Sequence, residues 1–248
     1  MPRSIKHSAN RLPLHLEISE MLAREIQAGI LLEGTKLAPE RTMAQTLGVS
    51  VGTLRKALLD LERKQLIQRI HGSGNYVRGD NVTETAKANT IYGFFRLELI
   101  QGGGLPTALV VSVNRINKPK DIVDIGPSKK AYRIRRLRRL NDIDAAIEEI
   151  WLDADQNRII RKSDLPDSLY LFYKEKLGFW ITRATDSVGI GELPSWKPDT
   201  FGLVPETPTP NTTWGYIERT SFDQSNRCIE FSRTWFNPTT TRFIARWK

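Results

Sequence analysis

Two short helical patterns joined by a glycine-containing turn limit the folds open to this chain more than any other feature of the sequence. The first begins at Pro39, where the missing amide donor costs nothing in a first helical turn, and ends at Gly48. The second follows Ser50, whose hydroxyl can accept from the free backbone amides of a helix start. Their inner faces are Met43, Ala44 and Leu47, then Leu54, Ala57, Leu58 and Leu61. This arrangement predicts a helix-turn-helix.

A preceding helix and a following hairpin complete the unit. From Pro13 to Gly29, apolar residues recur at three- and four-residue spacing. Two strand-like runs, 66–70 and 75–78, flank a loop that contains two glycines. Such a hairpin tip can approach a nucleic-acid backbone closely, because glycine has no side chain to clash. The whole pattern is typical of a winged helix-turn-helix, whose second helix presents its first turn to the major groove of DNA.

Positive charge is concentrated in this first unit. The chain has 248 residues and a formal net charge of +9, from 37 Lys and Arg against 28 Asp and Glu. Residues 1–79 hold 12 of the basic and 7 of the acidic residues, a net +5, which leaves +4 for the other 169. This excess favours a polyanionic partner, although a solvated basic surface is the alternative explanation.

Several classes of protein are not expected. No apolar run approaches the roughly 20 residues of a bilayer span, and the first eleven residues lack the apolar core of a signal peptide. Cys228 is the only cysteine, which excludes an internal disulfide framework and a multi-cysteine metal site. We therefore expect a cytoplasmic protein with no membrane partner.

The pattern changes after residue 79. Residues 80–90 are polar and small and lack an apolar period, which predicts a linker. Strand-like runs then occupy 91–99, 108–113, 131–140, 145–152, 214–223, 229–237 and 242–247, with one helix at about 167–177. We expect an α+β chain: a DNA-binding domain at 1–79 and, at 91–248, a domain built on a mainly antiparallel sheet.

Residues 13–77 resemble the amino-terminal domain of GntR-type regulators. Pro-Glu-Arg, Gly-Val-Ser, Thr-Leu-Arg-Lys-Ala-Leu and Gly-Ser-Gly occur in the family's order and spacing. The resemblance implies that Arg41 contacts a phosphate from the start of the second helix. It also implies DNA-facing roles for Ser50, Thr53 and Arg55 on the recognition helix and for His71 with Gly72 on the wing. A solvated helix face is the alternative for the two arginines.

One position departs from that family. Many members carry an arginine directly after the capping Ser or Thr, where it reads guanine, but here Val51 and Gly52 follow Ser50. Base recognition would then rest on Thr53, Arg55 and Lys56, or on apolar contact with thymine methyl groups.

Residues 91–248 resemble the UTRA domain of HutC-type GntR regulators. The resemblance rests on three spaced features: Arg-Leu-Arg at 136–138 followed by Glu148, Ser-Leu-Tyr at 168–170 ahead of Leu-Gly at 177–178, and Glu-Arg at 218–219 through Ile-Glu-Phe-Ser at 229–232 to Arg-Phe at 242–243. It implies a fold similar to chorismate lyase and the binding of a small effector without turnover.

The expected effector residues form a polar set. Alternation along a strand places Arg136 and Arg138 on one face, where two guanidinium groups could hold a phosphate or carboxylate. Glu148 and Glu230 could accept from hydroxyl or amino groups of the same ligand. Neutral hydrogen bonds would come from Ser168 and Tyr170, and Phe95 and Arg96 occupy the place of an aromatic-plus-small pair in relatives.

An exposed ladder is the alternative for the arginines of residues 133–139, paired with Asp142, Asp144 or Glu149. The tryptophans at 151, 196, 214 and 235 are expected in a core or an interface.

No catalytic chemistry is indicated. Beyond residue 80 there is no histidine, no nucleophile motif and no phosphate-binding glycine loop, so we expect no enzyme, no cofactor and no metal. The favoured interpretation is a homodimeric repressor that binds palindromic operator DNA and is controlled by a small anionic effector such as a sugar phosphate or carboxylate. An effector-independent DNA-binding protein and a lyase-like enzyme with a DNA-binding head are the alternatives.

Overall fold

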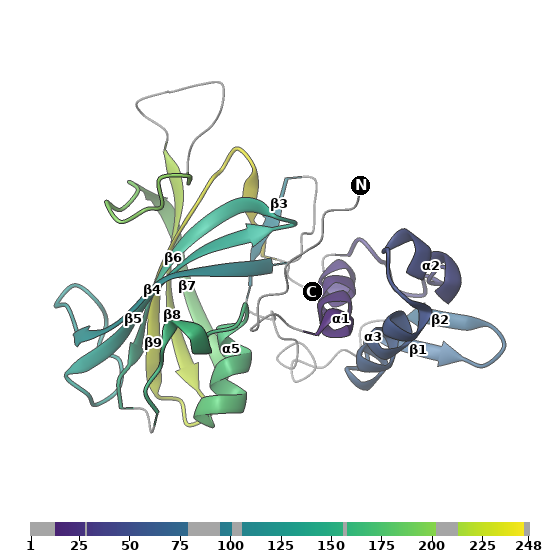
Figure 1. Cartoon of the computed structure of the whole chain (residues 1–248), viewed down its shortest axis with the longest axis horizontal. Coiled ribbons are helices and arrows are strands. Elements are labelled where there is room, and N and C mark those ends of the chain that lie inside the picture. The colour runs from purple at the N-terminus through teal and green to yellow at the C-terminus, as the bar shows by residue number, and fades with distance from the viewer. Residues whose placement is uncertain are drawn as a thin grey trace.

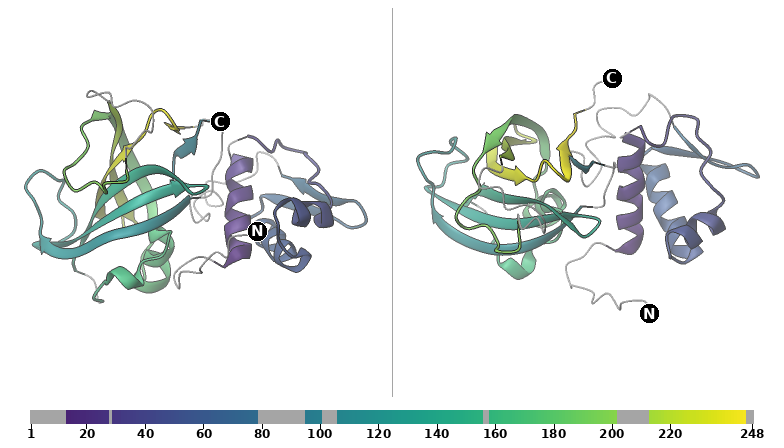
Figure 2. Two further views of the ribbon diagram at one scale, coloured as in Figure 1. Left: turned by 45° about the horizontal axis from the view of Figure 1, so that its top comes forward. Right: turned by 90° about the horizontal axis from the view of Figure 1, so that it is seen from above.

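The protein folds into two units that follow one another along the chain (Figure 1). The structure, a computed structural model, describes residues 13–27, 29–78, 95–100, 106–155, 158–201 and 213–245. Residues 13–78 form a helical head with a small hairpin, and residues 95–245 form a sheet domain. Helix α1 (Leu14–Gln27) lies between the rest of the head and the sheet domain in every view (Figures 1 and 2).

The head has the expected helices and hairpin. Helix α2 (Glu40–Thr46) and helix α3 (Val51–Arg63) are followed by strands β1 (Ile67–Ile70) and β2 (Gly74–Val77), which pair antiparallel. Ser50 caps α3, because its hydroxyl accepts from the backbone amide of Thr53 at 3.1 Å. Gly48 lies at a φ of 65°, the left-handed conformation that lets the chain turn sharply between α2 and α3.

Apolar packing and buried ion pairs join α1 to α3. Leu22 and Ala23 of α1 are buried in one cluster with the inner face of α3. Lys64 at the end of α3 pairs with Glu20 of α1 and with Asp60, its Nζ 2.7 Å from an Asp60 carboxylate oxygen. Ser19 of α1 donates to the same Asp60 carboxylate. These contacts join α1 and α3 into one packed unit.

The sheet domain is built on six antiparallel strands in the order β4-β5-β6-β9-β8-β7. Their bounds are β4 (Pro106–Asn117), β5 (Lys130–Leu140), β6 (Ile143–Asp153), β7 (Ile181–Gly191), β8 (Trp214–Asp223) and β9 (Cys228–Phe236). A separate pair joins β3 (Leu97–Leu99) to β10 (Thr241–Phe243). A 3₁₀ turn, η1 (Lys162–Asp164), precedes helix α5 (Leu169–Phe172), which continues into a π-helical turn, η2 (Tyr173–Leu177).

The expected α+β class with an antiparallel sheet is confirmed, but one strand was missed. The sequence indicated no strand at β7, because β7 is an edge strand whose residues are mostly exposed, so it lacks an apolar alternation. The proposed linker at 80–90, and the parts of two expected strands at 91–94 and 246–247, lie outside the described residues.

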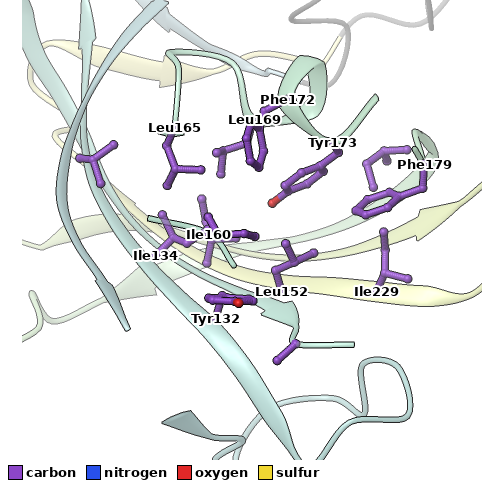
Figure 3. Packing of buried hydrophobic residues seen from close by; sticks show 14 residues of the cluster. Tyr132, Ile134, Leu152, Ile160, Leu165, Leu169, Phe172, Tyr173, Phe179 and Ile229 are labelled. Atoms are coloured by element: carbon purple, nitrogen blue, oxygen red, sulfur yellow. The ribbon is translucent and has the colours of Figure 1, made fainter. Parts of the chain in front are cut away.

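The two faces of the sheet carry different cores. On one face, α5, η2 and the residues just after them pack aromatic side chains against strands β5, β6 and β9. Figure 3 shows Phe172, Tyr173 and Phe179 above Leu152 and Ile229. The opposite face carries Trp235, which contacts Trp196 edge-on at 6.1 Å between ring centroids. Trp151 and Trp214 are also buried, so the four expected tryptophans belong to cores. None of the described helices is long and apolar enough to cross a membrane.

Candidate functional site

Exposed polar side chains lie on α2, on α3 and on the β1–β2 wing of the head. The side chains of Arg41, Arg55, Lys56 and His71 are all exposed there. Ser50 and Thr53 are already engaged with each other, since their hydroxyl oxygens lie 2.8 Å apart. The DNA-facing role of these residues stays a prediction, and the two hydroxyl groups also serve the helix start.

Glu40 links the recognition helix to the wing. One of its carboxylate oxygens lies 2.6 Å from Nε of Arg55 on α3, and the other lies 3.1 Å from Nη2 of Arg69 on β1. Both arginine side chains remain exposed, Arg55 by 60% and Arg69 by 50%. Sequence reasoning missed Glu40 and Arg69, because the contact joins residues 15 and 29 positions apart. By contrast, Arg41 has no ion-pair partner among the described residues.

The wing is held at its base and carries a glycine at its tip. Gly72 is exposed at a φ of 73°, which a side chain would strain. At the base, Lys36 bridges to Tyr76, with its ammonium 5.9 Å from the ring centroid. Ser73 and Tyr76 share a hydrogen bond of 2.7 Å. The tip can therefore approach a backbone while its base stays fixed.

Val51 directly follows the capping Ser50 and packs partly against the core of the head. Gly52 beside it is exposed, and a Cβ there would meet only the Ser50 hydroxyl at 3.8 Å. The polar groups left near the start of α3 are therefore Thr53, Arg55 and Lys56.

A pocket opens in the sheet domain between α5, the residues before β3 and the face of the sheet formed by β5, β6, β9 and β8. Its free space of about 90 Å³ is room for several water molecules or a small metabolite. All eight effector-binding residues expected from the sequence line it: Phe95, Arg96, Arg136, Arg138, Glu148, Ser168, Tyr170 and Glu230. Lining residues not expected include Asp167, Arg219, Ser232 and Thr234.

Strand register explains why these residues meet. Arg136 on β5 lies opposite Glu148 on β6, and Glu148 lies opposite Thr234 on β9. In another row, Ser232 lies opposite Arg219 on β8. Side chains alternate along each strand, so every second residue points to the same face of the sheet. The residues paired in these rows all point to the pocket face.

Arg136 and Arg138 share one carboxylate and one carbonyl. Arg136 donates to Glu148 from Nε at 3.1 Å and Nη2 at 2.7 Å, while Nε of Arg138 lies 3.8 Å from the same carboxylate. Both arginines also donate to the backbone carbonyl of Asp167 just before α5. Burial alone would raise the pKa of Glu148, but the two guanidinium groups bring it below its usual value. This part of the pocket is a fixed, ionised cluster.

Glu230 is a second buried carboxyl group, and its pKa is shifted in the opposite direction from that of Glu148. Its carboxylate accepts from the hydroxyls of Tyr170, at 3.1 Å, and Ser221, at 3.0 Å, and also from Tyr173. Burial raises the pKa of Glu230, and these hydrogen bonds only partly offset that effect. Because its present partners are all hydroxyl groups, Glu230 can exchange hydrogen bonds with the hydroxyl groups of a ligand.

Arg219 is fixed by Asp186 of the missed strand β7. Its Nε and Nη2 donate to the two Asp186 carboxylate oxygens at 2.6 and 2.7 Å. Burial would lower the pKa of Arg219, but the hydrogen bonds and charge of Asp186 raise it. The sequence signal was the Glu-Arg pair at 218–219, whose arginine shares the face of Ser221 on β8.

Two other arginines of β5 make ion pairs of the kind that the alternative expected, although the Arg135–Glu149 pair is largely buried and not exposed. Nε of Arg135 lies 2.7 Å from Glu149 on the opposite face, and Nε of Arg139 lies 2.6 Å from Asp144. The two explanations thus apply to different residues of one strand. Among the described residues, no three His, Cys, Asp or Glu side chains gather where they could hold a metal ion.

Comparison with known proteins agrees with both units. Residues 14–77 match the family described as bacterial regulatory proteins, gntR family, and residues 101–242, more than half of the chain, match the UTRA domain. The HTH-type transcriptional regulator SmoD of Agrobacterium fabrum is 45% identical over 242 residues, covering 98% of this chain and 99% of that protein. The HTH-type transcriptional repressor NagR of Bacillus subtilis is 22% identical over 94% of each chain.

Solved structures agree in fold. The possible transcriptional regulator YydK of Bacillus subtilis superposes with a TM-score of 0.52 at 19% identity, covering 96% of this chain and all of that one. The ligand-binding domain of a putative GntR-family regulator of Bordetella bronchiseptica covers 62% of this chain and 96% of its own at a TM-score of 0.53 and 16% identity. These relatives are transcriptional regulators and not enzymes, and this chain belongs to the GntR family, in its HutC-type architecture of a GntR helix-turn-helix domain followed by a UTRA domain.

Proposed function

We propose that this transcription regulator is a homodimeric repressor whose affinity for operator DNA is lowered by a small anionic metabolite bound in the UTRA pocket. The observation that carries the proposal is the convergence of four arginines and three carboxyl groups in one pocket. By count, the four guanidinium groups exceed the three carboxyl groups by one. Guanidinium groups aimed at one cavity suit a phosphate or carboxylate.

The remainder of the pocket suits hydroxyl groups. Glu230, Tyr170, Ser232 and Thr234 supply acceptors and hydroxyl donors along its wall. An anion that also carries several hydroxyls, such as a sugar phosphate or a sugar acid, matches both parts. A relative 24% identical over 93% of the chain is named the mannosyl-D-glycerate transport/metabolism system repressor MngR, and mannosyl-D-glycerate joins a sugar to a carboxylate.

In the head, we propose that Arg55, Thr53 and Lys56 read bases from the major groove while Arg41, His71 and Gly72 meet the DNA backbone. A two-fold operator asks for two symmetry-related heads, hence a homodimer acting in the cytoplasm. Repression is supported by the names of two relatives, NagR and MngR, both called repressors. Coupling between ligand and DNA is reciprocal, so each lowers the affinity of the protein for the other by the same factor.

A matched ligand screen tests the pocket. Thermal unfolding is followed with small acids beside their neutral counterparts, for example glucose 6-phosphate beside glucose and 3-phosphoglycerate beside glycerol. An acid present at 100 times its Kd should stabilise the protein by about 2.7 kcal/mol, and its neutral counterpart should not. Arg138→Met should lose this response, while Arg135→Met, which changes an arginine on the other face of β5, should keep it. A panel without any stabilising acid, or an equal response in both variants, would overturn the anionic effector.

A further inference from the structure

Arg24 belongs to α1 of the head, but two of its partners belong to the sheet domain. Its Nη2 donates to the backbone carbonyl of Leu97 at 2.8 Å, and its guanidinium carbon lies 5.0 Å from the centroid of the Phe95 ring. Only 8% of Arg24 is exposed. A charge buried to this degree persists only with fixed partners, so the contact sets how α1 sits against the sheet domain.

Phe95 is also a wall of the pocket and a partner of Arg138. The guanidinium carbon of Arg138 lies 4.7 Å from the centroid of the same ring. One aromatic ring therefore serves two guanidinium groups, one from the head and one from the pocket. A cation over an aromatic face is attracted by the ring quadrupole, and burial strengthens that attraction.

The backbone that follows Phe95 is anchored by hydrogen bonds. The amide of Ile244 donates to the carbonyl of Arg96 at 2.8 Å, and β3 pairs with β10 directly afterwards. The amide of Ile100 donates to the carbonyl of Thr240 at the other end of β3. The segment from Arg96 to Ile100 is thus held at both ends, and the Phe95 side chain just before it is the contact that Arg138 and Arg24 share.

We propose that Arg24 is a positioning residue of the effector pocket, and that Arg24, Phe95 and Arg138 form a relay between the pocket and the recognition helix. This inference rests on the proposed function, since it names the contacts by which an anion in the pocket changes DNA affinity. An anion paired with Arg138 neutralises its charge and so weakens its attraction to the Phe95 ring. Phe95 and Arg24 then readjust, and α1 carries α3 with it through the ion pairs of Lys64.

The relay can be tested without any ligand, by a double-mutant cycle on DNA binding of the full chain. The probe is a duplex that the wild-type protein selects from a random DNA pool, titrated by fluorescence anisotropy. Arg138→Met removes the pocket-side cation and should change the DNA Kd at least about threefold in the wild-type background. In the Arg24→Ala background the same substitution should change it by less than about 1.5-fold.

Arg136→Met is the matched control. Arg136 binds Glu148 and Asp167 in the same pocket but does not lie over the Phe95 ring, so its substitution should act equally in both backgrounds. Arg24→Lys keeps a cation near the ring and should restore part of the coupling, which a merely structural role would not require. If Arg24→Ala fails to fold, Phe95→Leu serves as the second background.

Two results overturn the relay. One is an equal response to Arg138→Met in the wild-type and Arg24→Ala backgrounds, and the other is no response in either. Neither outcome bears on the anionic effector, because no ligand is present in the cycle. Conversely, a ligand screen without a stabilising acid would remove the proposed effector and leave the measured coupling between Arg24 and Arg138 standing.

Discussion

In the head, Arg55 and Arg69 share the carboxylate of Glu40, and in the sheet domain Arg136 and Arg138 share that of Glu148. The side chains of the first two arginines are 60% and 50% exposed, whereas those of the second two are 6% and 2% exposed. Exposed ion pairs contribute little and are screened by salt, so the guanidinium groups of the head can exchange a carboxylate for a DNA phosphate.

The buried cluster behaves differently. Removing water from three charges is costly, and their mutual pairing and the Asp167 carbonyl offset that cost. Arg136 and Arg138 are consequently fixed in direction before a ligand arrives, which suits a pocket that must recognise one small molecule. The same two residue types thus give an adaptable surface in one unit and a rigid site in the other.

The largest effect should come from breaking the buried cluster. Glu148→Gln leaves two buried guanidinium groups without a carboxylate, and should lower the free energy of unfolding by about 3 to 5 kcal/mol. Urea unfolding followed by tryptophan fluorescence measures this loss. A loss below about 1 kcal/mol would mean that the buried and exposed clusters do not differ in the way described.

Acid should remove the same contribution from the wild-type protein. Because the pKa of Glu148 is lowered in the folded state, its stabilisation is present above the unfolded value of about 4.3 and is lost as the pH falls through the folded value. The difference in unfolding free energy between wild type and Glu148→Gln should therefore shrink below about pH 4.3.

In the same unfolding measurement, the stability contributed by Glu230 should depend on pH in the opposite direction, and Glu230→Gln tests this. The pKa of Glu230 is raised, so its contribution is present at low pH and is lost as the pH rises through the folded value. The variant should gain stability relative to wild type as the pH increases. If the stability difference from wild type changes with pH in the same way for Glu148→Gln and Glu230→Gln, the opposite pKa shifts of the two groups are contradicted.

A third effect should appear at the DNA surface. Arg55→Ala should abolish discrimination of the selected duplex, at a cost of about 1 to 3 kcal/mol in binding free energy, while the protein stays folded. Anisotropy titration beside thermal unfolding measures both quantities. Arg63→Ala, which removes an exposed arginine from the last turn of the same helix, is the control. Normal binding by the Arg55 variant would refute its role.

A smaller effect concerns the salt dependence of binding. Arg41→Ala should weaken binding to all duplexes alike and reduce the slope of log Kd against log salt by about one. Lys174→Ala, an exposed cation of the sheet domain, should leave the slope unchanged. An unchanged slope for Arg41→Ala would remove this residue from the phosphate contacts.

The smallest effect should follow from breaking the exposed cluster. Glu40→Gln should change the free energy of unfolding by only about 0.2 to 1 kcal/mol, and by less in high salt. Denaturation at two salt concentrations measures it. A loss as large as that of Glu148→Gln would show that Glu40 holds the wing and α3 together structurally.

Much of the fold could be predicted because its signals are local. The capping hydroxyl of Ser50, the turn at Gly48 and the apolar stripe of α3 each depend on neighbours within a few residues. Alternation likewise placed Arg136 and Arg138 on one face of β5. Strand β7 could not be predicted, because an edge strand that faces solvent carries no apolar period.

By itself, the sequence determined the two units, their order and the eight pocket residues, since helical spacing, strand alternation and the resemblance to known families all act on residue type and local position. Only the tertiary structure decided which carboxylate each arginine meets. Strand register places Glu148 beside Arg136, and the docking of α5 brings the Asp167 carbonyl to both pocket arginines. The packing of α1 against the sheet domain likewise brings Arg24 to Phe95, because partners 71 to 73 residues apart are selected by packing and not by local pattern.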